Sequence, residues 1–427
     1  MRHRLHFWFS SVKRFSYHHL LMKRISLLIA SILVTSAVLD AVPRHAGAGN
    51  HHSVFLNPET HDVWTVGEDI LGQMGFGMDS ELIKDNPRPH RVDPVWGGKA
   101  VSISAGLNTN AVVTDIGEVW TWGFNRLDQL GHSKGTEIVP EPRRVEGLPP
   151  SSAIVAGSAF MLAITTEGGL YSWGNNALGQ LGLGPDAPRR VAEPTRVELP
   201  EDVRLRDITT GINQVVALTT DNRVLAWGSN RNRQAGGPAG ENTVSRPTFV
   251  GGLPEGVVVA AVGVGNYTSF AILEDGRLFA WGENQFGQIP ATDDRAVFPP
   301  VEIEMPEGAA RPVAVTGGAR YVHALMEDGR VFAWGVNGPQ GQFGDGTRTR
   351  DVTTFSPPRA LPEDILLREL HTQTNHTVAL MRDGRFVGWG SNAQGRLAQD
   401  ERNDAGALLT VYPEPVNIQL VMRVEAE

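Results

Sequence analysis

Residues Trp173–Gly182 read Trp-Gly-Asn-Asn-Ala-Leu-Gly-Gln-Leu-Gly, and versions of this stretch recur along nearly the whole chain. The intervals between copies run from 51 to 56 residues, which is too regular for chance and too long for repeats built from helix pairs. The sequence therefore predicts a repeat array. The glycine of the Trp-Gly pair marks seven copies, at Gly67, Gly123, Gly174, Gly228, Gly282, Gly335 and Gly390.

Comparison of the seven copies shows which positions the repeat itself requires. An Asn or Asp stands two residues after every marker glycine, where a short side chain that bonds its own backbone favours a tight turn. A Gln follows four residues later in five copies and five residues later in copy six, and Arg396 takes its place in the last. A catalytic glutamine would not be needed six times. The recurrence predicts a buried amide that satisfies backbone groups where neighbouring repeats meet.

The segment before each marker is typical of a β-strand, because large and small side chains alternate with a period of two. Asp-Gly-Arg turns such as Asp275–Arg277 precede several of these strands, and Asp-Gly between two alternating runs predicts a hairpin. Each repeat contains about four short apolar runs, and no stretch has a sustained helical period. The fold class is therefore all-β.

Seven four-stranded sheets with two apolar faces each are buried best when they stand radially around an axis. The sequence thus predicts a seven-bladed β-propeller over residues 49–427 as one domain. Val421–Val424 resemble the first strand of a further repeat, and Val54–Leu56 resemble the strand that should follow it. We therefore expect the ring to close by pairing of these N- and C-terminal segments in one sheet.

Residues 1–48 have the form of a leader. Lys23-Arg24 precede an apolar run over Ile25–Leu39, followed by small residues, as in a secretory signal peptide. Because Met22 stands directly before the basic pair, it is the expected start, and residues 1–21 are expected to be an upstream extension of the gene.

Cleavage after Ala37 or after Ala48 fits the small-residue rule equally well. An uncleaved membrane anchor is the alternative, but spans usually need about 18 or more apolar residues. We expect no stable membrane span after cleavage, and an extracytoplasmic location, either periplasmic or secreted.

The body of the chain is acidic. Residues 1–48 hold 7 of the 38 Lys and Arg and 1 of the 47 Asp and Glu, which leaves 31 basic and 46 acidic residues and a net charge of −15. Nucleic acid is therefore a poor partner, since binding it depends on clustered basic side chains. The chain has no cysteine, which excludes disulfides and thiol catalysis.

The repeated pattern resembles the regulator of chromosome condensation repeats, with Asp-Gly-Arg turns and Asn-His-Thr-x-Ala-Leu at Asn375–Leu380 as further matches. The resemblance covers residues 46–427 and implies a seven-bladed propeller. The eukaryotic founder of that family is a nucleotide exchange factor for the GTPase Ran, and similar bacterial propellers include a secreted inhibitor of β-lactamases. Copy one departs from the pattern with Val66 in place of Trp, and copy five with Ile289-Pro290.

No catalytic constellation is visible. There is no nucleophile elbow, phosphate-binding loop or carboxylate pair, and the repeat glycines do not open a helix. His51, His52 and His61 lack a supporting metal-ligand motif. We therefore expect no enzyme activity, no cofactor and no metal.

The loop that follows each glycine-ending strand shares the fewest constraints among the copies. Repeat geometry places all seven loops at one end of the ring, and sites usually lie on loops held by a rigid frame. The chain is therefore expected to be an exported, monomeric scaffold that binds another protein through this face. The candidate binding residues are Phe160, Tyr267, Arg320, Tyr321, His376, Asn108 and Asn213.

Two alternatives belong to other functional classes. One is a guanine-nucleotide exchange factor-like regulator of a small GTPase, although the even spacing of the copies leaves no room for a long inserted wedge. The other is a propeller enzyme with an unrecognised site.

Overall fold

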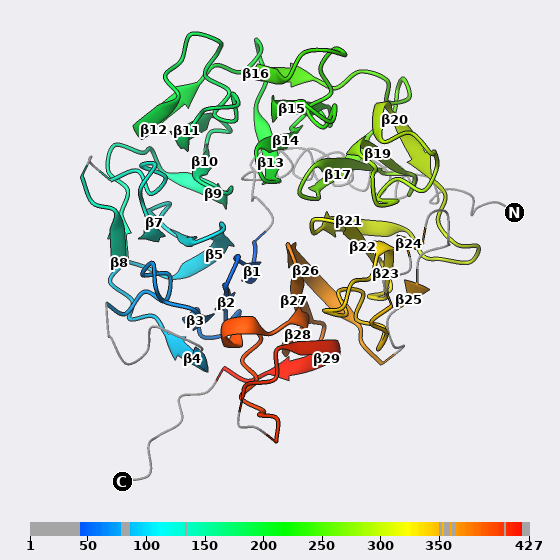
Figure 1. The fold of residues 1–427 in the computed structure, drawn as a ribbon. Coiled ribbons are helices and arrows are strands. Elements are labelled where there is room, and N and C mark those ends of the chain that lie inside the picture. The colour runs from blue at the N-terminus through cyan, green and yellow to red at the C-terminus, as the bar shows by residue number, and fades with distance from the viewer. Residues whose placement is uncertain are drawn as a thin grey trace, which may run out of the picture. The chain divides into compact units, whose positions relative to one another are not determined.

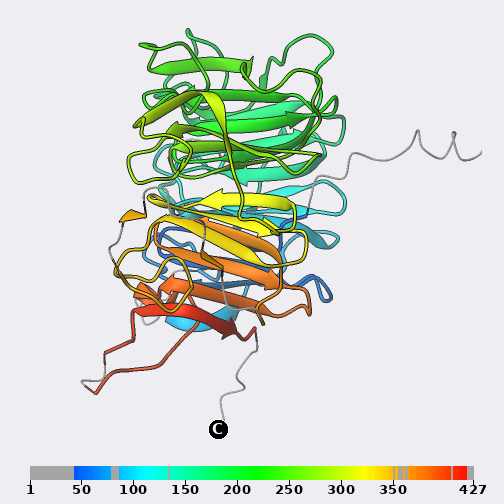
Figure 2. The same cartoon turned by 90° about the vertical axis from the view of Figure 1, so that its right-hand side faces the viewer.

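The computed structural model describes residues 43–77, 86–132, 135–349, 352–353, 359–360, 364–404 and 407–420. In this part of the chain, antiparallel sheets follow one another around a ring as seven blades, as predicted (Figure 1). Seen from the side, the strands run between the two faces of the ring (Figure 2).

The first four blades each contain four strands, numbered from the axis outward. Blade 1 contains β1 (Ala46–Ala48), β2 (His52–Leu56), β3 (Val63–Gly67) and β4 (Asn86–Arg91). Blade 2 contains β5 (Ala100–Ala105), β6 (Thr109–Thr114), β7 (Val119–Phe124) and β8 (Ile138–Arg144). Blade 3 contains β9 (Ser151–Ala156), β10 (Phe160–Thr165), β11 (Leu170–Asn175) and β12 (Arg190–Val197). Blade 4 contains β13 (Leu205–Thr210), β14 (Gln214–Thr219), β15 (Val224–Ser229) and β16 (Thr243–Phe249).

The last three blades repeat this order with small changes. Blade 5 contains β17 (Val259–Val264), β18 (Thr268–Leu273), β19 (Leu278–Glu283) and β20 (Ala296–Ile303). Blade 6 contains β21 (Pro312–Gly317), β22 (Tyr321–Met326), β23 (Val331–Val336) and two short outer pieces, β24 (Val352–Thr353) and β25 (Arg359–Ala360). Blade 7 contains β26 (Leu367–Gln373), β27 (His376–Met381), β28 (Phe386–Ser391) and β29 (Val411–Ile418), with a 3-10 turn, η1 (Ala393–Gly395). One parallel bridge, Val264 to Thr316, joins blades 5 and 6.

The marker glycines are required by the backbone. Gly228 has a φ of 99°, which side chains other than glycine rarely adopt. A Cβ there would lie 2.3 Å from the carbonyl oxygen of Asn213, the loop residue whose carbonyl accepts the next backbone N–H, that of Ser229. The repeat keeps its glycine because the loop and the strand end approach each other at this point.

The Asn and Gln positions hold the following turn together. In copy three, the Oδ1 of Asn176 accepts from the N–H of Leu181, and the Oε1 of Gln180 accepts from the N–H of Leu178. The backbone carbonyl of Gln180 then accepts the indole N–H of Trp227 in the next blade, at 3.0 Å. The predicted contact between repeats is confirmed: the Gln180 carbonyl binds the indole, and the Gln180 amide accepts within its own turn and also donates to the Oδ1 of Asn213 in blade 4.

Apolar side chains fill the space between neighbouring blades. Between blades 3 and 4, Phe160, Leu162 and Ile164 pack with Ile208 and Trp227, all of which are almost completely buried. Each blade therefore buries both of its faces, which is what the radial arrangement was expected to achieve.

The ring closes differently from the expected strand exchange. β2 pairs with β3 on one side and with β1 on the other, in the register Ala46 to Phe55 and Ala48 to Ser53. The edge of β2 that the sequence assigned to a C-terminal strand is therefore occupied by β1, and Val421–Val424 lie outside the described residues. Residues 43–48, which the sequence placed in the leader, are part of blade 1.

Side-chain packing joins blade 7 to blade 1. Phe55 and Phe386 meet edge to face with ring centroids 5.1 Å apart. Because Val66 replaces the usual Trp, the regular indole bond is missing at this seam. Instead, the hydroxyl of Ser53 donates to the backbone carbonyl of Arg396, at 2.8 Å.

Candidate protein-binding face

Short turns of two or three residues between the first and second strands of each blade define one end of the ring, which we call the loop face. The last residue of each turn uses its carbonyl to accept the N–H that follows the marker glycine; Tyr267 accepts from Glu283 at 2.9 Å, and Arg320 from Val336 at 2.8 Å. Its backbone is fixed while its side chain stays at least partly accessible. The seven residues at this position are His51, Asn108, Ala159, Asn213, Tyr267, Arg320 and Asn375.

Three candidate residues are not accessible, which corrects the expectation from the sequence. Phe160, Tyr321 and His376 are the first residues of β10, β22 and β27, and their exposed fractions are only 1%, 1% and 0%. The ring of Phe160 lies where a Cβ on Gly157 would be, 2.1 Å from the nearest ring atom, and the ring of Tyr321 covers Gly318 in the same way. The large side chains fill space that the preceding glycine leaves inside the ring.

These buried residues also bond across the interfaces between blades. The hydroxyl of Tyr321 donates to the carbonyl of Gln373 in blade 7, at 3.0 Å. The Nε2 of His376 lies 3.2 Å from the hydroxyl of Ser53 in blade 1. Their size therefore serves the packing of the ring.

The remaining candidates lie on the loop face. Asn108, Asn213 and Tyr267 are partly exposed and Arg320 is exposed. The Oδ1 of Asn213 accepts from the Nε2 of Gln180 at 3.3 Å, which ties this loop to blade 3.

Two further residues join Tyr267 and Arg320 in one patch, which we call the blade 5/6 patch: Tyr267, Glu283, Phe286 and Arg320. The guanidinium carbon of Arg320 lies 4.6 Å from the ring centroid of Phe286, within cation–π distance. Burial raises the pKa of Glu283, and the positive charge of Arg320 acts against that shift. Glu283 follows a marker glycine and Phe286 lies in the Gln turn, and this turn was not expected on the loop face.

The Gln turns lie on the loop face in every blade, because the bond from Ser229 N to Asn213 O and its equivalents join them to the loops. Arg231 and Arg233, which stand in the Gln turn of blade 4, therefore belong to the loop face. The opposite face instead carries the Asp-Gly-Arg turns.

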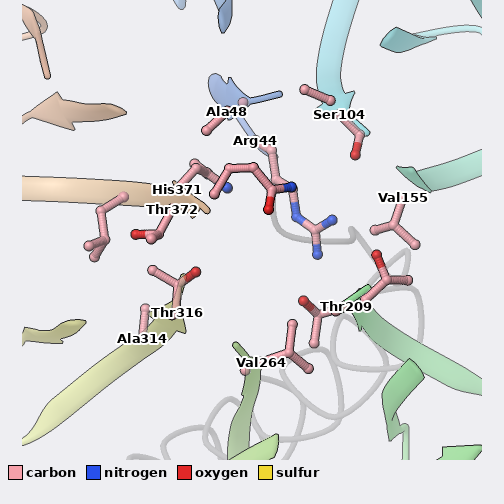
Figure 3. A pocket seen from close by; sticks show the side chains of 18 of the residues that line it. Arg44, Ala48, Ser104, Val155, Thr209, Val264, Ala314, Thr316, His371 and Thr372 are labelled. Atoms are coloured by element: carbon pink, nitrogen blue, oxygen red, sulfur yellow. The ribbon is translucent and has the colours of Figure 1, made fainter. Parts of the chain in front are cut away.

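The axis of the ring holds a channel of about 420 Å³ whose lining mixes polar and apolar side chains (Figure 3). Arg44 extends into it and donates from Nη2 to the carbonyl of Ile208 at 2.6 Å, with Asp207 Oδ1 at 3.3 Å. The Nδ1 of His45 lies 3.0 Å from Glu369 Oε2, and the Nε2 of His371 lies 2.6 Å from Glu369 Oε1. These two histidines hold the pKa of Glu369 below its usual range despite burial. The polar groups thus bond one another, and the N-terminal segment occupies part of the channel.

The three histidines considered as metal ligands make separate contacts. His51 pairs with Glu68 at 2.9 Å, His52 is buried against Asn110, and the Nδ1 of His61 lies 3.0 Å from the carbonyl of Ala100. Within the described ranges, no group of three or more His, Asp or Glu side chains could hold a metal ion. In the same part of the chain, no helix is long and apolar enough to cross a membrane.

Family comparisons agree with the geometry. The RCC1-like domain matches residues 149–426, and two descriptions of the regulator of chromosome condensation (RCC1) repeat match residues 117–164 and 100–129.

Individual proteins resemble this chain over most of its length. The chain is 29% identical over 364 residues to the Ultraviolet-B receptor UVR8 of Arabidopsis thaliana, which covers 84% of this chain and 79% of the receptor. It is 28% identical over 397 residues to the secretion-regulating guanine nucleotide exchange factor of Mus musculus, covering 83% and 80%. The structure of yeast RCC1 (Prp20) bound to Kap60 matches with a TM-score of 0.72 over 84% of this chain and 83% of that one, at 20% identity, which supports the fold alone.

Proposed function

The chain belongs to the RCC1-like domain family. From this membership, and from the leader-like sequence before the propeller, we propose that it is an exported, non-catalytic scaffold that binds another protein through its loop face. The blade 5/6 patch carries the proposal. It combines an exposed Arg, two accessible aromatic rings and a carboxylate on turns whose backbones are fixed by hydrogen bonds. Aromatic and Arg side chains on rigid loops are the residues that protein interfaces favour as anchors.

Replacing Tyr267 and Arg320 by Ala is expected to weaken the complex at least about 30-fold, because buried anchors contribute roughly 2 kcal/mol or more when truncated. The free energy of unfolding should change by only about 0.5 kcal/mol per site, because both side chains are accessible. The partner would be captured from the native host, identified by mass spectrometry, purified and titrated by calorimetry.

Two variants make this test specific. Arg311→Ala on the opposite face removes an exposed ion pair with Glu327 and a hydrogen bond to the carbonyl of Glu274, and it should leave the affinity unchanged. Tyr321→Ala is unsuitable as an interface probe, because Tyr321 is buried and its loss should destabilise the ring. An unchanged affinity for the Tyr267 and Arg320 double variant, with loss on altering the opposite face, would reject the loop face.

A second candidate function is supported by the mouse relative, which is named as a guanine nucleotide exchange factor. If the captured partner is a small GTPase, release of a fluorescent GDP analogue from it should be measured with and without this protein. Acceleration would favour the exchange function over the non-catalytic scaffold.

Export makes a prediction about the mature N-terminus, which should lie between residues 38 and 44. Cleavage after Ala37 would keep Arg44 and β1, whereas cleavage after Ala48 would remove the innermost strand of blade 1. Mass spectrometry of the protein from its native host should find this N-terminus and no peptide from residues 1–21. Detection of intact upstream peptides would argue against export.

A further inference from the structure

One position in the repeat distinguishes blade 3 from the others. The residue immediately before the third strand is charged in six blades and is Gly169 in blade 3. This position lies on the face opposite the loop face, because it ends the turn at the other end of the second strand. The six charged residues are Asp62, Glu118, Arg223, Arg277, Arg330 and Arg385.

Each of the six charged residues forms an ion pair. In blades 4–7 the Arg pairs with the Asp two residues before it, as Arg277 does with Asp275 at 2.8 Å. In blades 1 and 2 the turn instead supplies a carboxylate, and the outer strand supplies the guanidinium. Asp62 pairs with Arg91 at 2.7 Å, and Glu118 pairs with Arg144 at 3.3 Å.

In blade 3 the outer strand supplies a guanidinium, as in blades 1 and 2, but the turn supplies no carboxylate to pair with it. Arg91 and Arg144 stand opposite Trp64 and Trp120 in the strand register, and Arg196 stands opposite Tyr171 in the same way. Gly169 provides no side chain to pair with Arg196. Among the described residues, no ion pair reaches Arg196, whose side chain is exposed.

A hollow of about 1190 Å³ lies beside Gly169 and Arg196. Tyr171 and Arg196 line it from blade 3, Pro150 and Leu199 line it from the connections on either side, and Arg204 lines it just before blade 4. The hollow therefore places two guanidinium groups beside an aromatic ring and an apolar wall.

We propose that this hollow binds one acidic side chain of a partner polypeptide, whose carboxylate takes the place that Asp62 and Glu118 hold in blades 1 and 2. An ion pair left in water contributes little to affinity. The residues on either side of the acid must therefore contact Tyr171, Pro150 and Leu199 and shield the ion pair from water, which strengthens it. Proline and aliphatic residues suit such a wall.

Acidic residues in the lining restrict the ligand further. Glu167, Glu201 and Asp202 face the hollow, and Glu198 does so while pairing with Arg246 at 3.0 Å. Their negative charge disfavours a ligand with several carboxylates. The partner segment therefore carries a single acid between apolar residues. This site is independent of the loop face and can exist whether or not that face binds a protein.

The test uses a dye-labelled peptide, acetyl-Leu-Pro-Glu-Pro-Leu-amide, titrated with the full mature protein by fluorescence anisotropy. Saturable binding is expected, at least about tenfold tighter than that of the same peptide with Gln in place of Glu. Gly169→Glu should weaken binding at least about tenfold, because the new carboxylate pairs with Arg196 inside the chain. This variant is compatible with the fold, since Gly169 does not need a left-handed backbone and a Cβ there meets only the Thr165 hydroxyl, at 3.2 Å.

Matched variants separate charge from shape. Gly169→Ala should bind within about twofold of the natural protein, since it adds no carboxylate, whereas Arg196→Gln should lose at least about tenfold. Arg144→Gln, at the equivalent position of blade 2, should have no effect. The proposal is overturned if no saturable binding occurs at about 1 mM peptide, if the Gln peptide binds equally well, or if Gly169→Glu binds as the natural protein does.

Discussion

A chain that begins at Gly49 is expected to unfold at a much lower temperature than a chain that begins at Pro43. The shorter chain lacks β1, so Val54 and Phe55 in β2 lose their inner partner strand. It also exposes apolar surface between blades 1 and 7, where Ala46 and Ala48 are buried. The loss should be on the order of 5 kcal/mol, or roughly 6 °C in melting temperature for a folded body of this length.

Polar contacts in the channel add to this effect. Without residues 43–48, Asp207 loses Arg44, and Glu369 loses His45 together with the backbone N–H of His45, which donates to it at 2.7 Å. A buried charge that loses its partner is strongly destabilising. Thermal unfolding followed by circular dichroism should compare the two chains with one that begins at Met22. Equal melting temperatures for the chains that begin at Pro43 and Gly49 would show that β1 does not hold the ring closed.

The fold was predictable because comparison of the seven copies shows which residue types the backbone requires at each position. Gly228 and Asn176 stand at positions where only a few residue types fit, and the same types recur seven times in one sequence. β1 was missed for a physical reason. Ala46-Gly47-Ala48 has no marker and consists of small residues, which fit the crowded axis and fit a signal peptidase site equally well.

The binding face was only partly predictable. A large residue next to a loop, such as Phe160, suggests an exposed anchor when the sequence is considered alone. Whether it is buried depends on the glycine three residues earlier, whose missing side chain leaves room for the ring. Tyr267 and Arg320 each stand directly before the second strand of their blades, whereas Tyr321 is the first residue of that strand. Tyr267 is therefore accessible, although the neighbouring position in blade 6 holds the buried Tyr321. Glu283 and Phe286 come from another segment of the repeat, and only the fold brings them to the same patch.

Buried histidines are expected to make the propeller sensitive to acid. Burial lowers the pKa of His52, His132 and His323 to about 4, and that of His376 well below its usual value. In the unfolded chain these groups have pKa values of about 6.5 and take up protons first as the pH falls. Their contribution to stability is therefore complete above about pH 6.5 and is lost progressively between pH 6.5 and about 4.

The size of the effect follows from the pKa shift. For each histidine whose pKa is 6.5 in the unfolded chain and about 4 in the folded protein, the free energy of unfolding falls by roughly 3 kcal/mol as the pH drops from 6.5 to about 4. Asp69 acts in the opposite direction, because burial raises its pKa to about 6 and the folded protein binds its proton first. Burial also raises the pKa of Asp207 and of Glu283, which act in the same direction as Asp69. The four histidines should still give a clear net loss of stability at low pH.

The loss should concentrate at the seam between blades 7 and 1. His52 and His376 occupy equivalent positions in these adjacent blades, and Arg396 lies buried next to them with its guanidinium on the carbonyl of Asn50. Burial lowers the pKa of Arg396 to about 10, so it remains charged at neutral pH. His51 and Glu68 complete the group, and Glu68 is the one carboxylate acting on Arg396. Protonation of either buried ring thus adds positive charge where one positive charge is already present.

Replacing both His52 and His376 by Gln should therefore flatten the fall in melting temperature between pH 7 and pH 4.5. Glutamine fits this position, because Gln214 occupies it in blade 4. Melting temperatures across the pH series should be measured for the natural protein, for both single variants and for the double variant. His132→Gln serves as the control, because His132 is buried in blade 2 away from the seam and should remove only its own share of the pH dependence. If the double variant keeps the full acid sensitivity, the seam is not where acid acts on the ring, and the neutral imidazoles there do not determine its stability.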